Sequence, residues 1–123
     1  MEVELSEPYE WSRRGELPPV PGVYVISKAG VGIIYIGMTN ASEGLRSRVT
    51  LFHRAATTGR AKHSGGRTFH RFYGIETTDL TVQVHRAPRI AAPIIAAYIE
   101  FVERSLIWDF AQRHGHLPVC NAK

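Results

Sequence analysis

The 123-residue sequence has little cysteine, no long apolar run and no repeated segment, and each absence excludes a class of protein. Cys120 is the single cysteine, so an intrachain disulfide is impossible and a cysteine-based zinc site is very hard to build. The longest nearly uncharged run, 91–99, contains Pro93 and is far shorter than the roughly 20 apolar residues of a membrane-spanning helix. The segment 1–8 is acidic where a signal peptide is basic and then apolar. We therefore expect a cytoplasmic protein without a membrane span.

Length and composition indicate one folded domain. Apolar residues make up 44% and charged residues 21% of the chain, which are ordinary fractions for a globular protein and exclude a disordered or fibrous one. A chain of 123 residues has no room for a second domain with its own core.

Acidic residues are missing from the middle of the chain. The net charge is +4, but the segment 44–74 holds seven basic residues and no acidic one, together with several histidines and aromatics. Cations displace counterions from a phosphate backbone, and aromatic rings stack on bases. This pattern predicts DNA as the partner, with RNA left open and a merely solvated basic face as the alternative. The residues predicted to contact nucleic acid are Arg46, His53, Arg54, Arg60, Lys62, His63, Arg67 and Arg71.

Two β-branched and aromatic runs, 23–27 and 33–36, predict a β-hairpin. If the loop has four residues, 28–31, then Tyr24 lies directly opposite Tyr35 and both phenols share one face of the hairpin. Two phenols beside closely approachable glycine backbone can hold a water molecule or a phosphate oxygen through their O–H groups. The hairpin is therefore a candidate site for chemistry.

Apolar periodicity predicts two helices. The first follows the cap-rich segment 39–43 and reaches Gly59. The second begins at Pro93, a residue suited to a first helical turn, and ends at Gly115. The segment 60–74 between them has three glycines and no clear period, so we expect a basic loop there, with a short turn of helix left open.

A third strand completes the predicted fold. Apolar and polar residues alternate over 80–85, as in a strand with one buried face. The order of elements predicts an α+β domain with a small three-stranded antiparallel sheet flanked by helices. We expect residues 1–20 to form an N-terminal arm and residues 21–123 to form the domain.

Two charged residues border the apolar faces of the predicted helices. Arg48 lies three residues after Leu45 and four before Phe52, whereas Arg46 points outward. Glu103 lies within the apolar stripe of the last helix. A carboxylate in such a setting must be paired, protonated or bound to a metal ion. An ion pair between Glu103 and Arg48 and a metal site at Glu103 are both open at this point.

Five short motifs, in their order and spacing, resemble those of the GIY-YIG nuclease family over residues 21–121. The resemblance implies a three-stranded sheet with flanking helices, and hydrolysis of DNA phosphodiesters with one divalent metal ion, Mg²⁺ or Mn²⁺. The chain is similar to the minimal domain shared by homing, repair and structure-specific nucleases. The motifs are Gly22-Val23-Tyr24, Tyr35-Ile36-Gly37, Leu45-x-x-Arg48, Glu103-x-x-Leu106-Ile107 and Pro118-Val119-Cys120-Asn121.

The resemblance also implies a role for each catalytic position. Glu103 would bind the metal ion, and Arg48 would stabilise charge on the scissile phosphate. Tyr24 would accept a proton from the attacking water, and Tyr35 would place water or metal-bound groups. Asn121 would orient the site.

Two positions depart from the family pattern, and a third feature matches it. Met38 stands where many members have Lys, and Phe52 stands where several have His, with His53 one residue later on another helix face. The pair His63-Ser64 is similar to a His-Ser pair of homing-type members. Because of Met38, a catalytically degenerate nucleic-acid-binding module is the alternative to an endonuclease. Since the chain has no separate DNA-binding domain, a homodimer, a partner protein or recognition of DNA structure would supply specificity.

Overall fold

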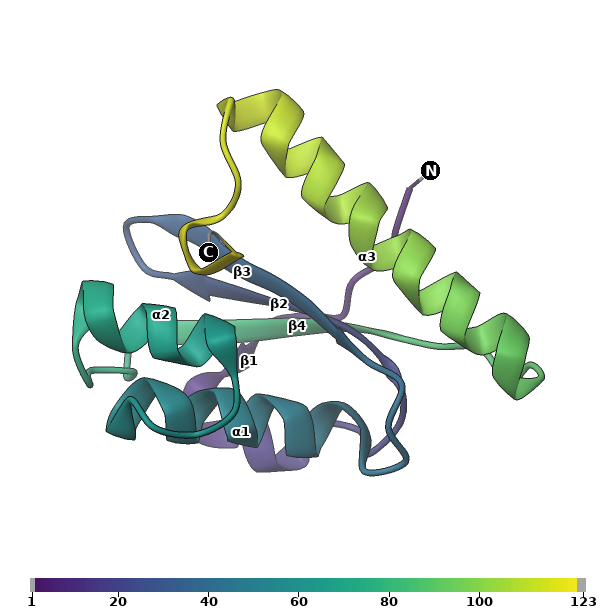
Figure 1. Ribbon diagram of the computed structural model, residues 1–123, viewed down its shortest axis with the longest axis horizontal. Helices are drawn as coiled ribbons and strands as arrows, with labels where there is room; N and C mark the ends of the chain where they lie inside the picture. The colour runs from purple at the N-terminus through teal and green to yellow at the C-terminus, as the bar shows by residue number, and fades with distance from the viewer. Residues whose placement is uncertain (1, 122–123) are drawn as a thin grey trace.

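The computed structural model of the protein describes residues 2–121 and shows an α+β fold (Figure 1). Its four-stranded antiparallel sheet has the strand order β1-β4-β2-β3. None of the helices within this range is long and apolar enough to cross a membrane. Along the chain the elements are β1 (Tyr9–Glu10), the 3-10 helix η1 (Trp11–Glu16), β2 (Gly22–Lys28), β3 (Gly32–Thr39), α1 (Gly44–Thr58), α2 (Ser64–Tyr73), β4 (Leu80–Arg86), α3 (Ala92–His114) and the 3-10 helix η2 (Val119–Asn121).

The sheet has one strand more than the three that the sequence predicts. The extra strand, β1, lies in the segment expected to be an arm and pairs with β4, with Tyr9 opposite Val82. Two residues are too few to show an alternating pattern, so the sequence carries no signal for this strand. The same segment contributes Trp11 and Leu17 to the core that also holds Tyr24. The first twenty residues therefore cover the sheet.

The hairpin of β2 and β3 forms, but its predicted register is wrong. The loop has three residues, 29–31, and a β-bulge at Ile34 adds one residue to β3. As a result Tyr24 lies opposite Gly37 and not opposite Tyr35. Because Tyr35 precedes Gly37 by two residues, it still points to the same face as Tyr24. The bulge thus leaves the two phenols together while displacing them along the strands.

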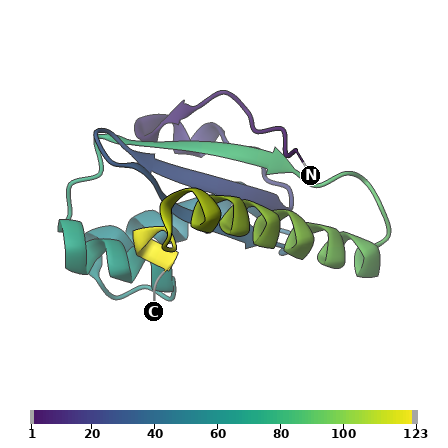
Figure 2. The same cartoon turned by 90° about the horizontal axis from the view of Figure 1, so that it is seen from above.

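Each face of the sheet is covered by its own helices, as Figure 1 and Figure 2 show. On one face Tyr24 and Ile26 of β2 pack with buried residues of α1 and α2. On the other face Val23 and Val25 pack with Ile99 of α3. The alternation along β2 therefore serves two cores, and the strand is buried on both sides.

The two predicted helices, α1 and α3, end where the sequence indicates. Gly59 and Gly115 follow their last residues with φ of 73° and 75°, and the N–H of each glycine donates to a carbonyl four residues earlier. Pro93 lies in the first turn of α3. Glycine adopts this left-handed conformation without strain, so the chain leaves both helices cleanly.

The segment 60–74 is largely a helix, α2, and not the loop that the sequence predicts. The face of α2 that packs inward contains Gly65, Gly66 and Thr68, so no apolar period is visible in the sequence. Gly66 lets α2 approach α1 closely, and Gly65 lies against the ring of Tyr35. A Cβ at position 66 would lie 2.6 Å from the Phe52 carbonyl oxygen.

Replacing Gly66 by alanine is expected to lower the free energy of unfolding by about 2 kcal/mol. The new methyl group would overlap backbone of α1, and this overpacking outweighs the roughly 1 kcal/mol of gained helix propensity. Urea unfolding followed by circular dichroism measures the change. Gly15, in η1, has no atom within 4 Å of its virtual Cβ, so Gly15→Ala serves as the control and should change stability by less than about 0.5 kcal/mol. Equal stability of the two variants would contradict the tight contact between α1 and α2.

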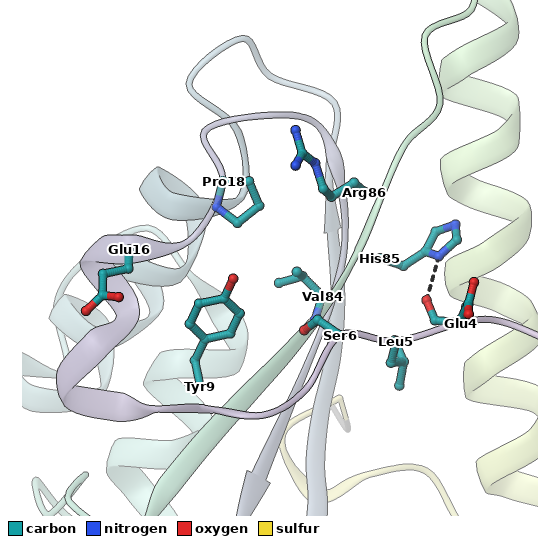
Figure 3. A pocket seen from close by; sticks show the side chains of 9 residues that line it. All are labelled: Glu4, Leu5, Ser6, Tyr9, Glu16, Pro18, Val84, His85 and Arg86. Atoms are coloured by element: carbon teal, nitrogen blue, oxygen red, sulfur yellow. Dashed lines mark hydrogen bonds between the residues drawn. The ribbon is translucent and has the colours of Figure 1, made fainter.

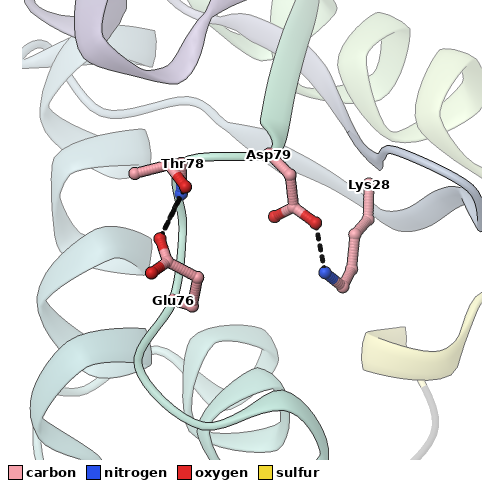
Figure 4. Close-up of polar contacts among 4 residues, drawn as sticks. All are labelled: Lys28, Glu76, Thr78 and Asp79. Atoms are coloured by element: carbon pink, nitrogen blue, oxygen red, sulfur yellow. Dashed lines mark hydrogen bonds and ion pairs between the residues drawn. The ribbon is translucent and has the colours of Figure 1, made fainter.

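The tip of the hairpin is fastened to the connection between α2 and β4 (Figure 4). Lys28 forms an ion pair with Asp79, and the Lys28 ammonium lies 5.3 Å from the centre of the Tyr73 ring. The N–H of Ala29 donates to the Asp79 carbonyl oxygen at 3.0 Å. In the same connection the Thr78 hydroxyl and N–H both donate to the Glu76 carboxylate. These contacts hold α2 against the sheet at the end opposite its first turn.

Candidate active site

Two tyrosines from neighbouring strands form the centre of the candidate site. The rings of Tyr24 and Tyr35 have centroids 5.8 Å apart. Both rings lie over Gly37, where an added Cβ would be 2.5 Å from Tyr35 Cε2 and 2.8 Å from Tyr24 Oη. Position 37 therefore has to be glycine, because any side chain there would collide with both phenol rings. Tyr24 has no exposed surface, while Tyr35 is partly exposed, so Tyr35 is the phenol nearer to solvent.

His63 places a third polar ring in this cluster. It is the N-cap residue of α2, is 1% exposed, and its Nδ1 accepts a hydrogen bond from the Gly66 N–H at 3.2 Å. A neutral imidazole that accepts at Nδ1 carries its hydrogen on Nε2. His63 Nε2 lies 2.7 Å from Tyr24 Oη, so the imidazole donates to the phenol oxygen. Burial, with a smaller effect of Arg48, lowers the pKa of His63 to about 3, and the ring is neutral at physiological pH.

The sequence places His63 among the nucleic-acid contacts, but the structure buries it beside the phenols. Its capping role was not recognised because the helix that it caps was expected to be a loop. The signal that could have identified it is the His63-Ser64-Gly65-Gly66 run, in which a side-chain acceptor precedes three small residues.

Arg48 supplies the positive charge of the cluster. It lies on α1 and is half-buried, whereas Arg46 is exposed, as the helix-face argument predicts. Burial raises the pKa of both Tyr24 and Tyr35, and the Arg48 guanidinium opposes this rise at both phenols. Arg46 instead donates from Nε to the Leu17 carbonyl oxygen at 2.8 Å. The two arginines of one helix therefore serve different surroundings.

Glu103 brings a carboxylate to the cluster from α3. Its side chain is 14% exposed, and burial raises the pKa of the carboxyl. Among residues 2–121 it forms no ion pair with Arg48, which was one open reading; Arg104 Nε lies 3.7 Å from Glu103 Oε1, and the Arg104 side chain is 74% exposed. The Glu103 charge contributes to the raised pKa of Tyr35. A largely buried carboxylate whose ion-pair neighbour is an exposed arginine is a good oxygen donor for a cation.

The surroundings of Glu103 fit a metal ion that takes few protein ligands. No group of three or more His, Cys, Asp or Glu side chains in the described part of the chain could hold a metal ion. Mg²⁺ commonly keeps several waters and is bound through one or two carboxylates plus substrate phosphates. Glu103 could be the single protein ligand in such an arrangement.

Asn121 fastens the end of the chain to the edge strand β3. Its side-chain Oδ1 accepts from the Ile36 N–H at 2.9 Å, and its Nδ2 donates to the Ile36 carbonyl oxygen at 2.8 Å. Ile36 lies between Tyr35 and Gly37 in the chain, so these two bonds fix the backbone that carries the phenol. Asn121 therefore affects the site through the backbone of β3.

The residues predicted to contact nucleic acid divide into two groups. His53 faces inward, where its Nδ1 accepts a hydrogen bond from Trp11 Nε1 at 2.9 Å. The cations have exposed side chains on α1, on α2 and on the connection between them: Arg46, Arg54, Arg60, Lys62, Arg67 and Arg71. These cations lie on the same two helices as Arg48 and the residues that follow His63, or on the connection between them.

A surface pocket opens elsewhere, where the N-terminal segment leaves β4 (Figure 3). The Ser6 N–H donates to the Val84 carbonyl oxygen at 2.9 Å, and His85 Nδ1 donates to the Glu4 carbonyl oxygen at 2.9 Å. Within the described chain, none of the lining residues belongs to the tyrosine cluster. This pocket therefore plays no part in the candidate site.

Comparisons with known proteins found no matching family model, no similar curated protein and no similar solved structure.

Proposed function

We propose that the chain is a metal-dependent endonuclease of the GIY-YIG type that hydrolyses phosphodiester bonds of DNA. One observation carries the proposal: the rings of Tyr24 and Tyr35 have centroids 5.8 Å apart. Arg48 lies close enough to lower the pKa of both phenols, and Glu103 lies close enough to raise the pKa of Tyr35. The resemblance to the nuclease motifs implies that these four side chains lie close together. The exposed cations of α1 and α2 support a polyanionic substrate.

In this proposal Glu103 holds Mg²⁺ or Mn²⁺ beside the scissile phosphate. When bound, the ion would polarise the phosphoryl group and lower the pKa of water. Arg48 donates to the phosphate oxygens and stabilises the charge that develops there. The cations on α1 and α2 hold the flanking backbone.

The tyrosine pair handles the proton of the attacking water. At neutral pH both phenols are protonated, because burial raises the pKa of each. Tyr24 receives a hydrogen bond from His63 and lies within the influence of the Arg48 charge, and both stabilise a phenolate. We therefore assign proton acceptance to Tyr24, and positioning of water on the solvent side to Tyr35.

The rate of cleavage is expected to rise with pH between about 7 and 9. Below the pKa of a catalytic phenol, the fraction present as phenolate grows about tenfold per pH unit. Initial rates at saturating DNA and fixed metal concentration measure the profile, with Tyr24→Phe compared in parallel. The variant should be slower and should lose most of the pH dependence. An identical slope in both chains would contradict the assignment of Tyr24.

Met38 is the observation that supports the alternative function, binding without cleavage. This side chain is 38% exposed and offers no amine to a phenol in the position where the family often has Lys. Arg48 is a cation that acts on both phenols, and for this reason we favour the nuclease.

Cleavage by the native chain tests the proposed function. A panel of supercoiled plasmid, flap, replication fork and four-way junction is incubated with Mg²⁺, Mn²⁺ or chelator. Cutting with a metal ion and none with chelator is expected, and the ranking of substrates would define the DNA structure recognised. Salt-sensitive binding without cutting under any condition would support the alternative module.

The same panel also tests the biological role and the substrate class. A preference for branched substrates would favour a role in DNA repair or recombination, and cleavage of an RNA copy would extend the substrate class. We place this activity in the cytoplasm, in line with the single, buried Cys120.

A further inference from the structure

The outward face of α3 carries three large apolar side chains that cover no part of the core. Ile94, Phe101 and Trp108 are 60%, 54% and 62% exposed. The opposite side of the same helix holds the buried Ile99 and Val102. Isolated apolar residues are common on surfaces, but three large ones along a single stripe of one helix indicate an interaction site.

The three residues share one stripe of the helix, about 10.5 Å apart along its axis. Each lies seven residues from the next, so the row drifts by only about 20° per step and spans about 21 Å of helix. A repeat of seven is the spacing at which two α-helices pack with a left-handed crossing of about 20°. The row is therefore suited to another helix.

We propose that the partner is a second copy of this chain, with α3 packed antiparallel on α3 about a two-fold axis at Phe101. Ile94 and Trp108 are equally far from Phe101 on either side. A two-fold axis at Phe101 therefore places Ile94 of one copy against Trp108 of the other and Phe101 against Phe101. A face whose pattern is symmetric about its centre is complementary to itself.

The charges beside the row favour the antiparallel arrangement. Glu100 and Arg104 are both exposed on α3. With the axis at Phe101, Arg104 of one copy lies about 3 Å along the helix from Glu100 of the other. In a parallel two-fold pair, Glu100 and Arg104 would lie on opposite sides of the contact in the two copies and would not meet. The charge pattern is thus complementary in one orientation.

The available area fits a reversible dimer. The exposed parts of the three apolar side chains contribute roughly 350 Å² per copy, and the small Ala97 and the stems of Glu100 and Arg104 extend the patch. The three side chains give roughly 700 Å² over both copies, so the interface is in the range of weak and transient complexes, below about 1,200 Å². Concentration-dependent association is expected.

The dimer would leave the candidate active site open. Glu103 and Phe101 point about 160° apart around the helix axis. The assembly would carry two catalytic clusters, and the inference does not depend on the nuclease proposal.

Analytical ultracentrifugation over a wide range of concentrations tests the dimer. The native chain should change from monomer to dimer, and Phe101→Glu should raise the dissociation constant at least about thirtyfold. Phe72→Glu is the matched control, since Phe72 is 64% exposed on α2, and it should associate like the native chain. A native chain that stays monomeric, or equal effects of the two variants, would overturn the proposal.

A charge exchange tests the orientation. Glu100→Arg places two arginines beside the axis in each copy, and Arg104→Glu places two glutamates there, so each variant alone should associate more weakly. A mixture of the two variants should form heterodimers at least about tenfold more tightly than either homodimer. An effect confined to one chain could not be restored by mixing. Failure of the mixture to associate would overturn the antiparallel arrangement.

Discussion

Replacing Glu103 by glutamine is expected to lower the cleavage rate by at least about a thousandfold while changing DNA affinity less than about threefold. The substitution keeps the shape of the side chain and removes the charged oxygen that would hold the cation. The fold should persist, because the ion-pair neighbour of Glu103 is the exposed Arg104 at 3.7 Å. Binding is measured with chelator present, and single-turnover cleavage with Mg²⁺ or Mn²⁺.

Asp109→Asn provides the control for this experiment. Asp109 is an exposed carboxylate of the same helix, and its removal should leave the cleavage rate within about twofold. Full activity of Glu103→Gln would exclude the metal site. A large loss of folding stability in Glu103→Gln would instead show a structural carboxylate.

Arg48→Ala is expected to lower the cleavage rate at saturating DNA by two to three orders of magnitude, whereas Arg46→Ala should weaken binding and leave that rate within about threefold. The charge of Arg48 reaches Tyr24, Tyr35 and His63, so its loss affects the reacting phosphate and the phenols together. Arg46 is exposed and donates to the Leu17 carbonyl oxygen.

The two arginine variants control for each other, because both remove one positive charge from the first two turns of α1. Arg48→Lys should recover part of the rate, since lysine restores the charge but not the planar pair of donors. The opposite pattern, with Arg46→Ala inactive and Arg48→Ala active, would mean that the assignment of helix faces is wrong.

The parts of the fold that the sequence predicts are those whose side chains show a period. α1, α3 and β4 carry apolar residues at regular spacing, and their bounds follow from this and from Gly59 and Gly115. α2 was missed because glycine at 65 and 66 replaces the apolar contacts that reveal a helix. The register of the hairpin was missed because a bulge is a backbone choice that neither strand pattern displays.

The residues of the candidate site could be predicted from the sequence more fully than their positions relative to one another. Arg48 and Glu103 stand out because charged side chains border apolar stripes. Their ion pair was a fair expectation from burial alone, and only the fold shows that the charged neighbour of Glu103 is Arg104 and not Arg48. The contact of His63 with Tyr24 joins residues 39 positions apart, and it depends on a helix start that local pattern does not reveal.

The contact of Asn121 with Ile36 has a consequence for colloidal behaviour. β3 is an edge of the sheet, and an exposed edge offers free N–H and C=O groups to strands of other molecules. The Asn121 amide occupies both groups of Ile36 in mid-strand, while the other edge, β1, has only two residues. Neither edge presents a long template for intermolecular strand addition, so the folded chain is protected against sheet-mediated aggregation. Loss of the last turn would expose one of these edges.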